Sequence, residues 1–342
     1  MRIRSVLLCN LIACGALVLS CAPASSDAVA DFYRDKTINL YVGFPPGGGY
    51  DIYARVLAAH FDRHVPGNPA IVVRNMTGGS GVRAAGYIST VTPQDGTSLG
   101  IFLDGITLGK VLGGGGDFDP LKLVWIGRIV STATVAVVWH TSPGQSVEDA
   151  KKQEIIVAAS VAGSTSSIIP TALNDLIGTK FKVIRGFQGS AKQSLAMERG
   201  EVHAIGSIAW EAVQMSKQKW LAEKKIRVLY AQGTRRIKAL PDSPAVVEFA
   251  TDDRSKRILN LVSVGPEIGR SIVAEPRIPP ERAAALRRAF MATMADPKFV
   301  ADIRQRKLTI EPQSGEEVQQ TVTAAMATPK GLVDQVKRYI GN

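Results

Sequence analysis

The sequence alternates between strand-type and helix-type segments, and this alternation limits the possible folds more than any other feature. Residues 38–44, 70–74 and 98–103 have the pattern of strands, while residues 50–61 and 82–92 carry apolar side chains at helical spacing. Strands that are separated by single helices form a parallel sheet with right-handed crossovers. The first part of the chain therefore predicts an α/β unit.

A second α/β unit follows a Gly-rich loop at residues 113–116. Its predicted strands are 155–159, 181–185, 202–206 and 226–230, and its predicted helices are 165–177, 190–199 and 209–223. Mostly helical segments follow, which we expect to pack on the first unit. We therefore predict that residues 31–130 with 240–342 form lobe 1 and residues 131–239 form lobe 2. The chain should cross between the lobes near residues 129–135 and 230–237.

The first 30 residues have the pattern of a secretory signal peptide. Arg2 and Arg4 precede an apolar run at residues 6–19, and Ala28-Val29-Ala30 is a small-residue cleavage pattern. The surroundings of Cys21 resemble a lipoprotein processing site, which leaves a lipid-anchored form as an alternative to a free one. In both forms the protein leaves the cytoplasm, and we expect it in the periplasm.

All three cysteines lie in this leader, so the 312 residues that follow contain none. Disulfides, Cys-ligated metals and thiol catalysis are therefore excluded from the mature chain. Removing the leader changes the formal net charge from +11 to +10. The basic residues form short, dispersed clusters without interleaved aromatic residues, which argues against nucleic acid and favours solvated surfaces or a small anionic ligand.

Two Gly-rich turns, residues 43–51 and 75–81, follow the first two predicted strands. Glycines let a ligand approach the backbone closely, and the amides of the following helix favour an anion. The first turn lacks the Lys and Ser/Thr of a P-loop, and Ile52 stands where a dinucleotide-binding turn requires its third glycine. Asp51, the only acid we find at these turns, either caps the helix or acts directly at a site.

A third turn, residues 163–167, follows a strand of the second unit and adds hydroxyl groups. Ligands of open α/β sheets bind at the carboxyl edge of the strands, where these turns are expected. Each turn taken alone is also compatible with a purely structural role. Together, facing one crevice, they predict a binding site for an anionic small molecule.

Several motifs carry a family resemblance: Phe44-Pro-Pro-Gly-Gly-Gly-Tyr-Asp51, Val72-Val-Arg-Asn75 before Gly78-Gly-Ser-Gly81, Pro93-Gln-Asp-Gly96 and Ala239-Leu-Pro-Asp-Ser-Pro244. With them, nearly the whole mature chain resembles the Bug family, the extracytoplasmic solute-binding proteins of tripartite tricarboxylate transporters. The resemblance implies a two-lobed periplasmic binding protein, a type II-like Venus flytrap, with a ligand cleft between its lobes. It also implies a monomer that captures a small carboxylate for a membrane permease, without cofactor, metal or nucleic acid.

Carried over residue by residue, the resemblance implies that the first two loops hold a ligand carboxylate and that lobe 2 selects the remainder of the ligand. The implied ligand-binding residues are Pro46, Gly47, Gly48, Gly49, Asp51, Gly78, Gly79 and Ser80 in lobe 1, and Ser164, Thr165, Ser166, Phe187, Gln188 and Gly189 in lobe 2. Lobe 2 departs from the family at residues 184 and 186–188, and Gly206-Ser207 stands near a usual acidic position. Losing that acid favours a carboxylic acid without an ammonium group.

The competing hypothesis is an exported two-domain α/β enzyme, or a sensor-input protein, that acts on an anionic small molecule. An enzyme needs a positioned acid, base or nucleophile, which only Asp51 could supply, so we expect no catalytic residue. His60 and His64 have metal-ligand spacing on a helix, but no third ligand is apparent. Arg185 either meets a second carboxylate or marks the exposed end of its strand.

Overall fold

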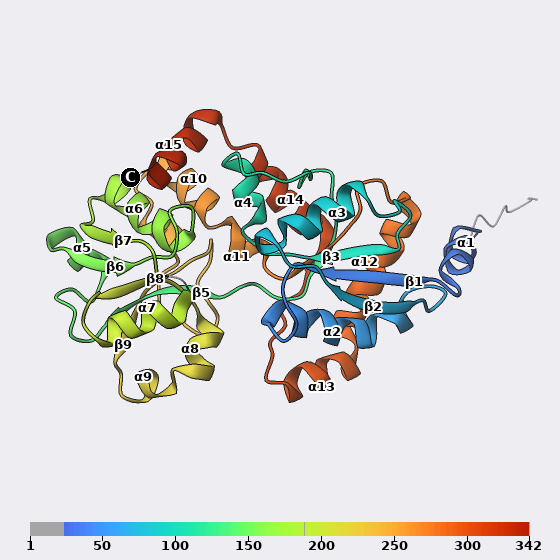
Figure 1. Cartoon of the computed structure of the whole chain (residues 1–342), viewed down its shortest axis with the longest axis horizontal. Coiled ribbons are helices and arrows are strands. Elements are labelled where there is room, and N and C mark those ends of the chain that lie inside the picture. Colours follow the sequence, from blue (N-terminus) through green and yellow to red (C-terminus); the bar gives the residue numbers. More distant parts are fainter. Residues whose placement is uncertain (1–23, 188, 342) are drawn as a thin grey trace, which may run out of the picture.

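Two β-sheets, each covered by helices, form two lobes that lie side by side (Figure 1). The computed structural model describes residues 24–187 and 189–341. Most of the predicted signal peptide, residues 1–23, therefore lies outside the described residues, as does Gln188. The predicted fold class of two α/β lobes is confirmed.

Lobe 1 contains a six-stranded sheet in the order β11-β4-β10-β3-β1-β2. Its strands are β1 (Thr37–Val42), β2 (Ala70–Asn75), β3 (Ser98–Ile101), β4 (Val124–Arg128), β10 (Ser271–Ala274) and β11 (Gln313–Ser314). The strand β1 pairs in parallel with β2 and β3, as the alternation predicted. On the other side β10 pairs antiparallel with β3 and β4, so the sheet is mixed.

Helices cover both faces of this sheet, and in Figure 1 α3 lies above it while α2 and α13 lie below. The helices around lobe 1 are α1 (Ala24–Tyr33), α2 (Gly49–Phe61), α3 (Val82–Thr90), α4 (Ile106–Val111), α11 (Val264–Ile268), α12 (Pro280–Ala295), α13 (Pro297–Gln305) and α14 (Gly315–Met326), with 3-10 turns η1 (Asp62–His64) and η2 (Gly79–Gly81). On α2, Tyr53, Leu57 and Phe61 recur every four residues and are buried, which fixes the face that packs on the sheet.

Lobe 2 contains a five-stranded sheet in the order β7-β6-β8-β5-β9. Its strands are β5 (Thr134–Trp139), β6 (Ile155–Ala158), β7 (Phe181–Ile184), β8 (Ala204–Ala209) and β9 (Ile226–Ala231). Its own helices are α5 (Val147–Lys152), α6 (Thr165–Ile177), α7 (Gly189–Glu198), α8 (Trp210–Ser216) and α9 (Gln218–Ala222). Because β6 runs parallel to β7 and β8, the turns after β6 and β8 lie at the same edge of the sheet.

Within residues 24–187 and 189–341, the chain crosses between the lobes three times. The first crossing lies between β4 and β5, which belong to different sheets. After β9 the chain forms η3 (Val246–Phe249) and α10 (Asp253–Val262), and α10 packs on α6 of lobe 2 before α11 packs on α4 and α14 of lobe 1. The third crossing joins α14 to α15 (Lys330–Gly341), which also packs on α6.

The expectation that all helices after residue 240 pack on the first unit is therefore wrong for α10 and α15. The Tyr339 hydroxyl of α15 donates a hydrogen bond of 2.6 Å to Oδ2 of Asp175 in α6. An amphipathic pattern shows that one face of a helix is buried, but it does not show which sheet the face covers. Within the described part of the chain, no helix has the length and apolar character needed to cross a bilayer.

Candidate functional site

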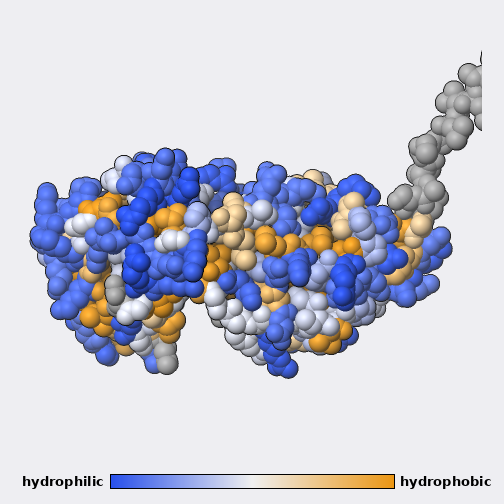
Figure 2. Space-filling model, turned by 90° about the horizontal axis from the view of Figure 1, so that it is seen from above, coloured by the Kyte–Doolittle hydropathy of each residue, from blue (hydrophilic) through white to orange (hydrophobic). Residues whose placement is uncertain are grey.

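The two Gly-rich turns of lobe 1 touch each other at the carboxyl ends of β1 and β2. A Cβ atom on Gly43 would lie 2.5 Å from the Cα of Gly81, so only glycine permits this approach. Gly81 itself has a φ of +103°, which side chains rarely tolerate. The predicted adjacency of the two turns is therefore present in the fold. A notch in the surface separates the two lobes (Figure 2).

Asp51 holds the first turn in shape from inside. Its Oδ2 accepts hydrogen bonds from the Gly47 amide at 2.8 Å and from Arg55 Nε at 2.9 Å. Its Oδ1 accepts from Nδ2 of Asn75, the last residue of β2, at 2.8 Å. Burial raises the pKa of this carboxyl, but the three hydrogen bonds outweigh burial and lower the pKa to about 2. Of the two roles open from the sequence, the contacts favour the structural one.

The other loop residues of lobe 1 are exposed. This applies to the backbone of Pro46, Gly47, Gly48, Gly49, Gly78 and Gly79. Gly47 has a φ of +85°, whereas Gly48, at the N-cap of α2, has an ordinary φ of −81°. The first amides of a helix have no partner inside the helix, so those of α2 are available to an anion. Ser80 contributes its backbone to η2.

In lobe 2 the predicted hydroxyl groups bond to one another at the start of α6. The Ser166 side chain is buried, and its Oγ lies 2.7 Å from the Ser164 Oγ and accepts from the Ser160 amide at 3.1 Å. Thr165, half-buried, donates to the Ser207 Oγ at 3.5 Å. Of the three residues, Ser164 and Thr165 are half-buried and Ser166 is buried.

The second segment predicted for lobe 2 lies against the first. The Phe187 amide donates to the Ala159 carbonyl at 3.2 Å, and Gln193 Nε2 donates to the Phe187 carbonyl at 3.5 Å and to the Ser160 Oγ at 3.0 Å. Gly189 begins α7 with a φ of +80°. Arg185, which is half-buried, donates from Nε to the Ser167 Oγ at 2.9 Å and so braces α6.

The structure explains why no acid stands at residue 206. Pro170 lies inside α6 and has no amide to donate to the Ser166 carbonyl. Gly206 packs against this carbonyl so closely that a Cβ would lie 2.2 Å from its oxygen. Beside it, Gln232 donates from Nε2 to the Gly206 carbonyl at 2.6 Å and accepts from the Ser207 Oγ at 3.0 Å. Any side chain at residue 206 would collide with α6.

Comparisons with known proteins were made for the whole chain, and no protein-family model matches it. The curated relative described as "UPF0065 protein in gbd 5'region" from Cupriavidus necator is 23% identical over 339 residues, covering 95% of this chain and 95% of that protein. A TctC solute-binding protein from Polaromonas has a similar structure, with a TM-score of 0.68, 21% identity, and coverage of 89% of this chain and 99% of that one.

Two further solved structures have a similar fold. The periplasmic binding protein BugD has a TM-score of 0.59 and 19% identity over 90% of this chain and 98% of its own. The structure of R. palustris Rpa4515 with adipate has a TM-score of 0.59 and 22% identity over 90% and 97% of the two chains. The chain has the fold of the TctC and Bug solute-binding proteins. The predicted resemblance to the Bug family is thereby confirmed.

Sequence reasoning missed a further turn of lobe 1, which follows β3 at the same edge of the sheet as the two Gly-rich turns. Asp104 follows β3 and is partly buried. Its amide donates to the Tyr50 hydroxyl at 3.1 Å, and its Oδ2 accepts from the Thr132 hydroxyl of the first crossing. Burial raises the pKa of Asp104, while the hydrogen bonds from Thr132 and the Gly105 amide lower it, and burial prevails. The rule applied to the first two strands would have found this turn.

An ion pair between buried Arg270 and half-buried Glu211, also missed, joins the two lobes. Arg270, one residue before β10, lies 3.2 and 3.4 Å from the two carboxylate oxygens of Glu211, in the first turn of α8. The expectation that Asp51 is the only acid near the turns is therefore wrong, because Asp104 and Glu211 also lie there. Sequence reasoning missed the pair of Arg270 and Glu211 because these two residues are far apart along the chain.

The two histidines with metal-ligand spacing have other partners. His60 Nε2 lies 3.0 Å from Asp302 Oδ2, and His64 Nε2 lies 2.8 Å from Asp296 Oδ2. These contacts join the end of α2 and η1 to α13 and its N-cap. Among the described residues no group of three or more His, Cys, Asp or Glu side chains is placed to hold a metal ion.

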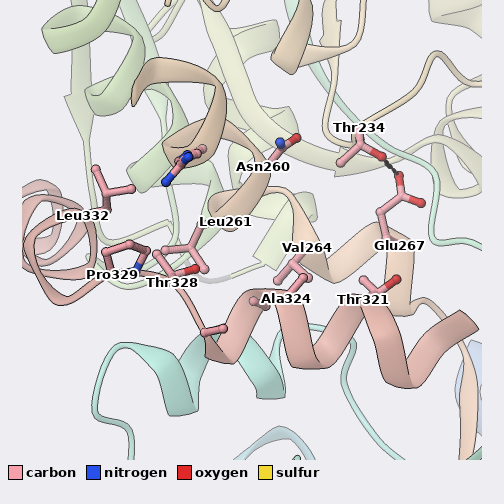
Figure 3. Close-up of a pocket in the computed structure, with 13 residues that line it drawn as sticks. Thr234, Asn260, Leu261, Val264, Glu267, Thr321, Ala324, Thr328, Pro329 and Leu332 are labelled. Carbon is pink, nitrogen blue, oxygen red and sulfur yellow. Dashed lines mark hydrogen bonds between the residues drawn. The ribbon is translucent and has the colours of Figure 1, made fainter. Parts of the chain in front are cut away.

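Two cavities lie beside the crossings, away from the predicted loops. A cavity of about 870 Å³ is bounded by the first crossing, α8, residues 232–239 and α13, and Glu211 lines it. A second, of about 600 Å³, lies among α10, α11, α14 and the start of α15 (Figure 3). In it Glu267 accepts a hydrogen bond of 2.5 Å from the Thr234 hydroxyl. None of the ligand-binding residues predicted from the sequence lines either cavity.

Proposed function

We propose that this protein is an extracytoplasmic solute-binding protein that captures a small organic carboxylate and delivers it to the permease of a tripartite tricarboxylate transporter. One observation supports this most strongly: in both lobes, glycine turns and helix amino ends follow the carboxyl ends of parallel strands. In such folds the ligand binds at these strand ends. The adipate in the structure of Rpa4515, which has this fold, supports the same ligand class.

The groups at the turns favour an anion. The exposed backbone of Gly48 and Gly49 and the amino end of α6 offer hydrogen-bond donors. The hydroxyls of Ser164 and Thr165 lie beside the amino end of α6 and donate to Val161 and Ser207. We include Pro46, Gly78, Gly79, the backbone of Ser80, Phe187 and Gly189 in the proposed site because they belong to the same turns. Asp51 and Ser166 act from within by holding these turns in shape.

We propose a binding role without catalysis. Asp51 was the one candidate for an acid or base, but its pKa of about 2 makes its carboxylate a weak base at neutral pH. All its described partners are donors that keep it ionised. We also propose that the protein is a monomer that is exported to the periplasm, where it is either free or anchored through Cys21. The fold that it shares with the periplasmic protein BugD supports this location.

A thermal-shift screen of dicarboxylates, tricarboxylates, aromatic acids, amino acids and sugars tests this function. A ligand that binds only the folded state adds roughly 2.7 kcal/mol at about 100 times its dissociation constant. We therefore expect small carboxylates to raise the melting temperature by a few degrees. Native mass spectrometry of the purified protein should reveal an acid that co-purifies with it. Shifts confined to sugars or cationic amino acids would contradict the proposal.

A further inference from the structure

The guanidinium of Arg270 is a buried charge at the boundary of the two lobes. Its side chain is only 10% exposed. The guanidinium carbon lies 4.7 Å from the ring centre of Tyr53 and 5.5 Å from that of Tyr50, both on α2. Contact with aromatic rings holds a planar guanidinium in a fixed orientation. Arg270 is therefore positioned rather than free to reach solvent.

The hydrogen-bonding capacity of this guanidinium is not fully used. Its contacts with Glu211, at 3.2 and 3.4 Å, are longer than the roughly 2.7–2.9 Å typical of hydrogen bonds between ions. Its Nε atom is buried and has no hydrogen-bond partner among residues 24–187 and 189–341. A buried donor without a partner is costly, so the site favours a further acceptor.

The same guanidinium lies against the first Gly-rich turn. One terminal nitrogen of Arg270 lies 3.1 Å, and Nε 3.8 Å, from the position that a Cβ on Gly49 would occupy. Gly49 is the first residue of α2, and the first amides of a helix have no partner within the helix. An acid that binds these amides through one carboxylate could therefore place a second one beside Arg270.

We propose that Arg270 binds a second carboxylate of the ligand, that this carboxylate displaces Glu211, and that the protein therefore selects dicarboxylates over monocarboxylates. This inference rests on the proposed carboxylate-binding function and adds the residue that sets its specificity. Arg270 touches the ligand directly in this arrangement, while Glu211 acts as an exchangeable counter-ion.

Glu211 is suited to be displaced. Its side chain is 35% exposed, so its carboxylate can move into water without burying an unpaired charge. Asp104, the other acid near Arg270, is held by the Thr132 hydroxyl and stays in place. The exchange leaves Arg270 paired with a carboxylate before and after binding, which avoids the large cost of a buried lone charge.

The test compares diacids with monoacids of equal chain length, adipate with hexanoate and succinate with butyrate, by isothermal titration calorimetry. For the wild-type protein we expect the diacid to bind at least about tenfold more tightly. Arg270→Met should weaken diacid binding by about 30-fold or more, as expected when one partner of a buried charge pair is removed. Its monoacid affinity should change by less than about threefold.

Glu211→Gln is the matched variant on the other lobe. Because it removes the competing carboxylate, it should strengthen diacid binding and leave monoacid binding unchanged. If the ion pair of Arg270 and Glu211 were purely structural, Glu211→Gln would instead weaken the binding of both the diacid and the monoacid. Should Arg270→Met fail to fold, Arg270→Lys keeps the charge but not the planar fork, and it should reduce diacid affinity to an intermediate value.

Equal losses for diacid and monoacid in the Arg270 variants, or weaker diacid binding by Glu211→Gln, would overturn this inference while the proposed function stands. Absence of any carboxylate binding by the wild-type protein would overturn the proposed function and the inference with it.

Discussion

The two halves of the proposed site are built in different ways. In lobe 1 the loops present mainly backbone, and one buried acid, Asp51, fixes their shape through three hydrogen bonds. In lobe 2 the corresponding turn is held by a network of side chains that includes Ser160, Ser166, Gln193 and Arg185.

This difference separates two tasks. Backbone amides at a helix start recognise a carboxylate whatever the rest of the ligand is. The lobe 1 half is therefore suited to a group that all ligands share. Side chains differ in size and polarity, so the lobe 2 half, together with Arg270 at the boundary of the lobes, is suited to selection. The comparison also predicts that lobe 1 depends on a single residue, whereas changes in lobe 2 are spread over several.

The substitution Asp51→Asn tests whether the first Gly-rich turn of lobe 1 depends on this one residue, and we expect it to have the largest effect. The substitution leaves the Gly47 amide and Arg55 with a weaker acceptor, and its own amide donors would face theirs. We expect the free energy of unfolding to fall by about 2 kcal/mol, because a buried charged acceptor of three hydrogen bonds is replaced by a neutral one. Urea unfolding followed by circular dichroism measures this. A loss below about 0.5 kcal/mol, the usual range for an uninvolved surface position, would show that the turn does not depend on Asp51.

The ionisation of Asp51 should also make the free energy of unfolding depend on pH. Because the pKa of Asp51 is lowered from 3.8 to about 2 in the folded protein, its ionised form stabilises the fold above pH 4. This contribution, about 2 kcal/mol, should disappear as the pH falls from about 4 to about 2. The stability difference between the wild-type protein and Asp51→Asn should shrink over this interval. A difference that stays constant with pH would contradict the assigned pKa.

Gly48→Val tests whether the lobe 1 backbone faces the ligand. The φ of −81° suits a side chain, and the nearest atom to a Cβ there is the Pro45 carbonyl oxygen at 3.9 Å, so the fold should be preserved. We expect carboxylate affinity, measured by calorimetry, to fall about tenfold because the side chain occupies the ligand's place. Gly115→Val, at another exposed glycine with open space around it, is the control. Unchanged affinity in Gly48→Val would remove this loop from the site.

The smallest effect is expected from Thr165→Val in lobe 2. It removes one hydroxyl, whose contact with Ser207 is 3.5 Å long, and keeps the side-chain shape. We expect a change in the ratio of affinities for different acids of about two- to fivefold, with stability nearly unchanged. Thr171→Val on the same helix, whose hydroxyl bonds the Ser167 carbonyl, serves as the control. Equal loss for every acid would place Thr165 in the shared half of the site.

Local patterns in the sequence were sufficient for much of this architecture. The alternation of strands and helices predicted both lobes, and the glycines of residues 43–51 and 75–81 indicated two turns that meet. These features are encoded over short distances, where turn chemistry and periodicity decide the conformation.

Features that depend on distant segments were not predictable in this way. Arg270 and Glu211 meet only because β10 and α8 reach the same boundary, and nothing near either residue signals the other. The packing of α15 on α6 has the same origin, since the buried face of Val333 and Val336 fits any apolar surface. The acid at Asp104 was within reach, because it follows a strand as the first two turns do.

The three crossings limit how the two lobes can move as rigid bodies. Two adjacent connections leave a pair of bodies free to bend and also to twist about the line that joins them. A third connection, fastened to α6 by Tyr339, adds a constraint on such twisting. We therefore expect the course of the chain, rather than the ligand, to guide how the two lobes align when they move.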